Sequence, residues 1–172
     1  MPDKALPLEI ERKFLITCPD LAALERRPNC QRVDIVQTYL KTADSAESAR
    51  VRLWESEGRR TYFSTRKRTI NAMTRVEVEE EITPEAYEAL LGQADPDCRP
   101  IRKRRYRLHE NDLCYEIDVY PEWTDRAILE IELASEDQAF VLPDCVTLIR
   151  EVTEDRRYTN HALARRGVAW PD

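Results

Sequence analysis

The most informative feature of the sequence is a set of like-charged residues at alternating positions. Alternate residues of a β-strand share one face, so such residues lie about 7 Å apart on one side of a sheet. The pattern occurs in Glu9/Glu11 (with Lys13), Arg50/Arg52, Glu77/Glu79, Lys103/Arg105, Glu116/Asp118 and Glu130/Glu132, with Lys67 and Arg75 as further bases. For any one strand, a half-buried sheet with its charged face in water is the simpler interpretation. The whole set instead favours a charged interior that binds ions.

The residue types indicate which ions this interior would bind. Clustered carboxylates without histidine or thiolate are hard oxygen ligands, which suit Mg²⁺ or Mn²⁺. Converging lysine and arginine side chains suit an anion with several charges. Since the chain has only three glycines, phosphates would be held by side chains instead of a glycine-rich loop. A cation site beside a polyanion site predicts a metal–polyphosphate substrate, whose hydrolysis needs positioning and an activated water.

Eight segments with period-two patterning must position these charges. They span about residues 7–16, 33–41, 49–56, 60–68, 74–82, 101–109, 113–120 and 127–134. Glu57-Gly58 and Glu110-Asn111-Asp112 predict tight turns between antiparallel strands. The opposite strand faces are apolar, as at Val51 and Leu53. We therefore expect a mainly β (α+β) fold: an eight-stranded antiparallel closed β-barrel tunnel with a charged lumen, formed by residues 1–172 as a single domain.

A few helices are expected outside the barrel. One spans about residues 19–27, and a second is capped by Thr83 and ends at Gly92. Ser135 is expected to cap a short third helix. A fourth covers about residues 157–165 and either packs on the barrel or covers a tunnel mouth.

For several charged side chains, strand alternation alone predicts whether they point into the barrel or toward solvent. Within Arg66-Lys67-Arg68 we expect Lys67 to face inward, and within Glu79-Glu80-Glu81 we expect Glu80 to face solvent. In the strand at 101–109 we assign Arg102, Arg104 and Arg107 to the face opposite Lys103 and Arg105.

Composition excludes several function classes. The 172 residues carry 33 acids and 27 bases, a net charge of −6, so we expect no nucleic-acid partner. No apolar run approaches the roughly 18 residues of a membrane span, and Met1-Pro2-Asp3-Lys4 lacks signal-peptide character. We therefore expect a cytoplasmic protein with no membrane partner, as a monomer or homodimer. Five scattered cysteines and two histidines outside recognisable motifs argue against a disulfide framework or a structural zinc site.

The ordered motifs resemble a known family. Glu9-x-Glu11-x-Lys13 is similar to the E-x-E-x-K signature of the triphosphate tunnel metalloenzymes, also called the CYTH superfamily. Further segments resemble the family in order along nearly the whole chain: Arg50-x-Arg52, Lys67, Arg75-x-Glu77-x-Glu79, Lys103-Arg-Arg105-Tyr106, Glu116-x-Asp118, Glu130-x-Glu132 and the tail from Glu151 to Ala164.

The resemblance implies an eight-stranded tunnel and roles for its charged residues. Phosphates would be bound by Lys13, Arg50, Arg52, Lys67, Arg75, Lys103 and Arg105. Metal ligands would be Glu9, Glu11, Glu130 and Glu132, with Asp118, Glu77 and Glu79 in support or orienting water. Lys13, Glu11 and Glu79 are the expected catalytic residues. Arg157 also matches a family position, but an outer salt bridge would explain it equally well.

The leading functional hypothesis is metal-dependent hydrolysis of inorganic triphosphate to pyrophosphate and phosphate by metal-activated water. A thiamine triphosphatase or a class IV adenylate cyclase is the alternative enzyme, and Trp54, Trp123, Trp170 and Tyr62 are the aromatics available to an organic substrate. A non-catalytic polyphosphate-binding module is the alternative outside enzymes. The abundance of carboxylates argues against that module, since binding phosphate requires bases.

Overall fold

Nine β-strands and a few short helices make up the fold. The computed structural model describes residues 8–171, so residue 7 of the first predicted strand and the extreme N-terminus lie outside the described residues. The strands are β1 (Leu8–Thr17), β2 (Cys30–Leu40), β3 (Glu47–Ser56), β4 (Arg59–Thr69), β5 (Thr74–Ile82), β6 (Ile101–Glu110), β7 (Leu113–Val119), β8 (Arg126–Leu133) and β9 (Leu148–Glu151). The helices are α1 (Leu21–Glu25), α2 (Pro84–Leu91), the 3₁₀ turn η1 (Arg156–Tyr158) and α3 (Asn160–Arg166).

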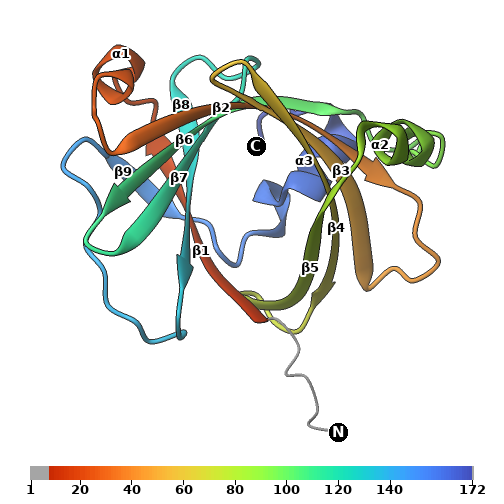
Figure 1. Cartoon of the computed structure of the whole chain (residues 1–172). Helices are drawn as coiled ribbons and strands as arrows, with labels where there is room; N and C mark the ends of the chain where they lie inside the picture. The colour runs from red at the N-terminus through yellow and green to blue at the C-terminus, as the bar shows by residue number, and fades with distance from the viewer. Residues whose placement is uncertain (1–7, 172) are drawn as a thin grey trace, which may run out of the picture.

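The first eight strands close into an antiparallel barrel in the order β1-β5-β4-β3-β2-β6-β7-β8, as expected (Figure 1). Closure depends on β1, whose first residues pair with β5 while Ile10–Thr17 pair with β8. The short β9 pairs with β1 at Phe14–Ile16 as a ninth strand. The β3–β4 hairpin turns at Glu57-Gly58, and both residues have positive φ, which suits a tight two-residue turn.

The helices α1 and α2 pack against apolar residues on the outer faces of the strands. The side chain of Asp20 accepts a hydrogen bond from the backbone of Ala23 and starts α1, whose Leu24 packs against the outer face of the β1–β8 region. Thr83 caps α2 in the same way, and Tyr87 of α2 packs on Val51 of β3. Both helices lie outside the barrel (Figure 1). The second helix ends before Gly92, as predicted.

The predicted helix after Ser135 is wrong. The Ser135 hydroxyl donates to Asp137 Oδ1 at 2.7 Å instead of capping a helical N–H. Pro143 has no N–H to donate to a helical hydrogen bond. The carbonyl of Val141 accepts a hydrogen bond from the Tyr115 hydroxyl at 2.7 Å instead of from a helical N–H. Residues Phe140 and Leu142 then pack against the outer apolar cluster in an irregular segment.

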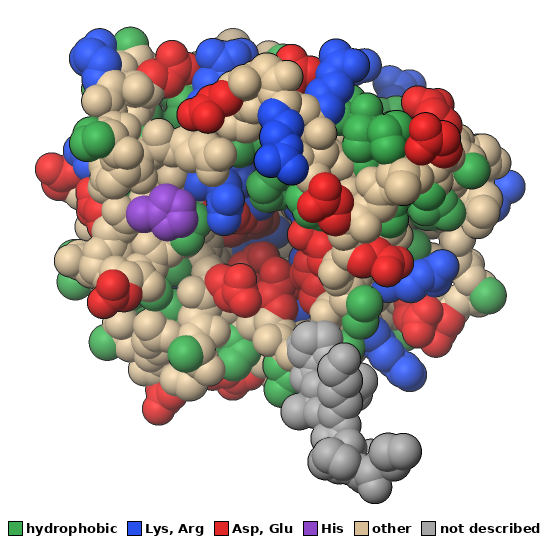
Figure 2. All heavy atoms as spheres, in the orientation of Figure 1, with side chains coloured by type: hydrophobic (Ala, Val, Ile, Leu, Met, Phe, Trp, Pro, Cys, Tyr) green, Lys and Arg blue, Asp and Glu red, His purple; other side chains and the backbone are tan. Residues whose placement is uncertain are grey.

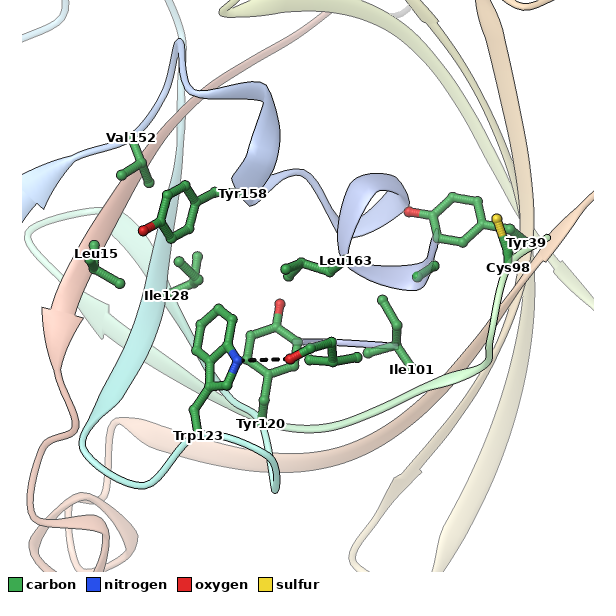
Figure 3. Packing of buried hydrophobic residues seen from close by; sticks show 12 residues of the cluster. Leu15, Tyr39, Cys98, Ile101, Tyr120, Trp123, Ile128, Val152, Tyr158 and Leu163 are labelled. Carbon is green, nitrogen blue, oxygen red and sulfur yellow. Dashed lines mark hydrogen bonds between the residues drawn. The ribbon is translucent and has the colours of Figure 1, made fainter. Parts of the chain in front are cut away.

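The fourth predicted helix closes one end of the barrel. It is divided into η1 and α3 by Thr159, whose hydroxyl accepts a hydrogen bond from Ala162 N. Tyr158 and Leu163 pack against lumen-facing residues of the strands, including Leu15, Ile101 and Tyr120 (Figure 3). The indole N–H of Trp123 also donates to the carbonyl of Val168 at 3.0 Å (Figure 3). Unlike the other helices, this segment therefore covers an end of the lumen.

Within residues 8–171, no helix combines the length and apolar character that crossing a membrane would require.

Candidate active site

A cavity of about 680 Å³ occupies the charged part of the barrel. Figure 2 shows it as a hollow with acidic and basic side chains gathered inside. Strand register explains why these residues converge, since β1 places Glu11 opposite Glu132 and Lys13 opposite Glu130 of β8. The cavity is lined by these site residues predicted from the sequence: Glu9, Glu11, Lys13, Arg50, Arg52, Lys67, Arg75, Glu79, Arg105, Glu130 and Glu132. Asp118 and Lys103 are missing from this lining.

One wall of the cavity is rich in carboxylates. Glu11 and Glu132 are direct cross-strand partners, and such like-charged pairs repel. Within the described residues, the Glu132 carboxylate has neither an ion pair nor a hydrogen bond, and its pKa is raised by partial burial and by the charges of Glu77, Glu116 and Glu11. A cation bound at this wall would relieve the repulsion.

Glu9 and Glu77 form a second acidic pair at the same wall. Burial, a hydrogen bond with Glu77 and nearby charges raise the pKa of Glu9 to about 8. Burial acts to raise the pKa of Glu77 as well, but the hydrogen bond with Glu9 and the Lys67 ammonium lower it to about 2. The Lys67 ammonium lies 3.1 Å from Glu9 and 2.6 Å from Glu77. The two carboxyl groups therefore share one proton near neutral pH.

Arg50 is the most unusual base of the cavity. Its side chain is buried, its Nε has no hydrogen-bond partner, and within the described residues its guanidinium forms no ion pair. Its pKa stays raised despite burial because Tyr39, Glu77 and Glu130 contribute favourable charge. A buried guanidinium without a direct partner is costly. This cation is therefore placed to receive an anion from the cavity.

Arg52 and Arg75 are held by carboxylates at the cavity surface. Arg52 pairs with Glu79, which also accepts a hydrogen bond from Thr65 Oγ1 at 2.8 Å. Burial and the neighbouring Arg50 lower the pKa of Arg52 to about 10, so it remains cationic at neutral pH. Arg75 lies 3.5 Å from Glu9 and 3.4 Å from Glu11.

Lys13 connects the cavity to the segment that closes the barrel. Its ammonium lies 2.9 Å from Glu130 and 3.7 Å from Glu11, and it donates to the carbonyl of Tyr158 at 3.5 Å. Burial acts to lower its pKa, but the two carboxylates outweigh burial and raise it. Lys13 therefore stays protonated, in a position set by both β8 and η1.

Asp118 has a different environment from that expected of a metal ligand. Its side chain is fully buried, and its two oxygens accept hydrogen bonds from Lys103 at 2.5 Å and from Arg105 at 2.7 and 2.8 Å. Burial lowers the pKa of Lys103 to about 8, although the charge of Asp118 opposes that shift. Asp118 and Lys103 thus form an ion pair outside the cavity lining, and both oxygens of the carboxylate already accept hydrogen bonds from bases.

Arg107 faces the cavity, so its assignment to the opposite strand face is wrong. Residues 103, 105 and 107 alternate regularly in β6, and Arg107 lines the cavity with Glu116, its partner at 3.2 Å. Parity alone should have placed it inside. Trp54 also lines this region.

The C-terminal segment also contributes to the cavity wall, and none of its residues was among the predicted site residues. Asp155, Arg156 and His161 belong to the lining although they come from the loop, η1 and α3. Within the described residues, the Arg156 side chain has no ion pair. No local pattern marked these residues, because they reach the cavity only when the C-terminal segment packs over the barrel end.

This arrangement can bind a polyanion and a hard cation together. Bases from β3, β4 and β5 and carboxylates from β1 and β8 line one cavity. Carboxylate oxygens are the donors that hard divalent cations prefer. The geometry therefore suits a phosphate chain whose charge is shared between guanidiniums, ammoniums and a cation.

Comparisons with known proteins agree with this fold and chemistry. The inorganic triphosphatase of Nitrosomonas europaea is 35% identical to this chain over 162 residues, which cover 91% of this chain and 96% of that protein. The crystal structure of the inorganic triphosphatase NE1496 superposes with a TM-score of 0.54 at 32% identity, covering 95% of this chain and 97% of that chain. The PH1819 protein of Pyrococcus horikoshii OT3 shares the fold, with a TM-score of 0.57 at 20% identity and coverage of 75% and 80%.

A family model gives the same result for most of the chain. The model described as CYTH domain matches residues 7–165, which include every strand of the closed barrel. The match also extends through β9 into α3, so it includes the segment that covers the barrel end. Together with the 35% identical relative, this match shows that the chain belongs to the CYTH domain family.

Proposed function

We propose that this protein hydrolyses inorganic triphosphate to pyrophosphate and phosphate, with Mg²⁺ or Mn²⁺ as the cofactor. The observation that carries the proposal is the buried Arg50 guanidinium, which lines the cavity without an ion-pair partner among the described residues. Its charge is best compensated by an anionic substrate. The 35% identical relative named inorganic triphosphatase supports the same reaction class.

Glu9, Glu11 and Glu132 would hold the divalent cation. All three line the cavity, and a cation would relieve the repulsion between the opposed Glu11 and Glu132. We omit Asp118 from this set because both of its oxygens are already engaged, and Glu130 is held by Lys13 and by Arg105 at 3.0 Å. When bound, the cation neutralises negative charge and lowers the pKa of a coordinated water molecule toward neutral pH.

The basic residues would bind and orient the phosphate chain. Arg50 and Arg52 come from β3, while Lys67 and Arg75 come from β4 and β5. Their positive charges stabilise the negative charge on phosphoryl oxygens as the terminal phosphorus is attacked. Lys13, held by Glu130 and the Tyr158 carbonyl, would add a fixed positive charge beside the proposed cation ligands. Glu79 would position Arg52 and accept a proton from the attacking water.

The surroundings of Trp54 favour an inorganic substrate over a nucleotide or thiamine derivative. Guanidiniums of Arg52 and Arg107 lie 5.3 and 5.7 Å from the centre of this ring. The Phe63 ring contacts Trp54 edge-on at 5.2 Å between centroids. An aromatic ring of a substrate would have to displace these contacts in order to stack.

The test uses full-length protein with inorganic triphosphate, ATP or thiamine triphosphate, each with Mg²⁺, with Mn²⁺ and with a chelator. We expect chelator-sensitive release of pyrophosphate and phosphate from inorganic triphosphate at the highest kcat/KM. The Arg50→Gln variant should raise KM strongly, whereas Arg66→Gln, on the exposed face of β4, should not. Cyclic AMP from ATP would indicate a cyclase. Retention of triphosphate without product would indicate a binding module and overturn the proposal.

A further inference from the structure

Three potential metal ligands meet at the closed end of the barrel. The ligand atoms of Asp95, Cys98 and His161 all lie within 4.8 Å of one another. Asp95 and Cys98 belong to the loop before β6, whereas His161 belongs to the first turn of α3. The cluster is separate from the carboxylates of Glu9, Glu11 and Glu132, and it differs from them by offering nitrogen and sulfur.

The loop and helix are held in place by hydrogen bonds that do not use the clustered ligand atoms. Asp95 N donates to the carbonyl of Tyr39 at 2.9 Å, and Arg99 N donates to the carbonyl of Ala164 at 2.9 Å. Cys98 is buried beside Tyr39 and α3 in the apolar cluster of the barrel end (Figure 3). The His161 ring packs on Tyr39, with 4.8 Å between the ring centroids. Backbone ties and packing therefore position all three side chains.

One ligand atom of each residue has at most a weak contact at present. Asp95 Oδ1 accepts from Asp97 N at 2.9 Å, whereas Oδ2 has only the long contact of 3.7 Å with the Cys98 sulfur. Within the described residues, the imidazole nitrogens of His161 form no hydrogen bond. His161 also lines the large cavity, and the Asp95 and His161 side chains are both half-buried, so each is reached by solvent.

We propose that Asp95, Cys98 and His161 form a Zn²⁺ site that ties α3 to the loop before β6. A thiolate, an imidazole and a carboxylate are ligands that zinc accepts together, while Mg²⁺ prefers oxygen alone. The thiolate and the carboxylate balance the double charge of the ion, and the thiol proton is released to solvent on binding. Three protein ligands leave a fourth position for water.

The inference does not rest on triphosphate hydrolysis, since the site lies among residues with no part in the proposed reaction. Its effect would be structural. Zinc would link the segment that covers the barrel end to the strand region beneath it, which should resist thermal opening. Binding that is confined to the folded state raises stability by mass action.

The experiment is a Co²⁺ titration of full-length protein in excess Mg²⁺, which occupies the carboxylates of the main cavity. Co²⁺ bound to a thiolate gives an intense near-ultraviolet charge-transfer absorption that oxygen ligands do not give. We expect one equivalent to saturate this absorption and one equivalent of Zn²⁺ to remove it. Zinc should also raise the Tm of the wild-type protein.

Matched variants assign the site. Cys98→Ser should abolish the absorption and the zinc-dependent rise in Tm, and His161→Gln or Asp95→Asn should weaken Co²⁺ binding at least 10-fold. Cys114→Ser is the control, because the Cys114 sulfur contacts His109 at 3.9 Å in a different part of the chain and should behave as wild type.

Three results would overturn the proposal. They are a wild-type protein without the absorption, an absorption that persists in Cys98→Ser, or one that disappears in Cys114→Ser. Circular dichroism of each variant checks the fold. If Cys98→Ser fails to fold, His161→Gln decides the question, since unchanged Co²⁺ affinity in that variant contradicts the site.

Discussion

The interior of this barrel has two regions that the same strands build in opposite ways. In β1, Glu11 and Lys13 face the cavity, and the next inward residue, Leu15, belongs to the apolar cluster. In β6, Arg105, Lys103 and Ile101 share the inward face, and Ile101 belongs to the same apolar cluster as Leu15. The lumen therefore changes from charged to apolar along single strands. The charged region has room for a ligand, whereas the apolar region is filled by the chain's own C-terminal segment.

The difference shows how the barrel separates function from stability. The charged region keeps Arg50 without an ion pair among the described residues and places Glu11 opposite Glu132. Buried or opposed charges of this kind destabilise a protein that has no ligand. The closed end buries Leu163, Tyr158 and Val168 against the strands, and burial of this apolar surface stabilises the fold. Variants in the two regions should therefore have opposite consequences.

The largest effect is expected for Glu132→Gln in the charged region. Removing this carboxylate should lower kcat/KM for triphosphate by about 1,000-fold, because it removes one charge from the proposed cation site. Its thermal stability without ligand should be slightly above that of the wild type, since Glu132 has no ion pair within residues 8–171 and the substitution removes its repulsion with Glu11. Steady-state kinetics across a metal titration is the measurement. Glu80→Gln, on the exposed face of β5, is the matched control and should retain full activity. Wild-type turnover in Glu132→Gln would remove Glu132 from the cation site.

Leu163→Ala tests the apolar region. Leu163 is completely buried beneath the barrel end, and its truncation should lower the free energy of unfolding by about 2–5 kcal/mol. Urea denaturation measures this change. Val141→Ala should have little effect, because Val141 is 78% exposed. A stable Leu163→Ala protein would mean that the C-terminal segment contributes little to closing the barrel.

Asp118→Asn separates a structural from a catalytic role for a residue that the sequence marked as a metal ligand. The substitution removes the counter-charge of Lys103 and Arg105, which should cost about 3 kcal/mol of stability. The metal concentration needed for half-maximal activity should stay near the wild-type value. If stability is retained and that metal concentration rises instead, Asp118 binds the cation.

A pH dependence of stability is expected to arise at Glu9. Since its pKa is raised to about 8 in the folded protein from 4.5, the native state binds more protons than the unfolded state between these values. Stability without metal should therefore fall as the pH rises from about 5 to 8. Melting curves at several pH values measure this slope, which should be shallower in Glu9→Gln. An equal slope in both proteins would place the shared proton elsewhere.

Much of the candidate site could be predicted because β-strand alternation is a local property. Two residues such as Arg50 and Arg52 share a face in any strand. The pairing of β3 with β2 and β4 does not change that shared direction. The same rule places Arg107 on the inward face, because it lies two residues after Arg105 in β6. The resemblance to a known family then implied that the eight strands form a tunnel.

Other features depended on contacts between distant segments. Whether Asp118 binds metal or neutralises bases depends on where Lys103 and Arg105 of the neighbouring strand place their nitrogens, which spacing does not specify. Ser135 has the sequence of a helix cap, but its hydroxyl bonds Asp137 and the following residues pack irregularly on the barrel. Local preference was overridden by packing in that segment.

Local sequence is enough to place charged residues on one strand face and apolar residues on the other, because side-chain direction alternates with every residue along a strand. Long-range packing is needed to establish which charges lack partners, where the lumen is closed and that Asp95, Cys98 and His161 meet. These outcomes depend on the register of closure and on the path of the C-terminal segment. Both are set by the free energy of packing segments that are distant in the sequence, and a short sequence pattern does not specify that energy.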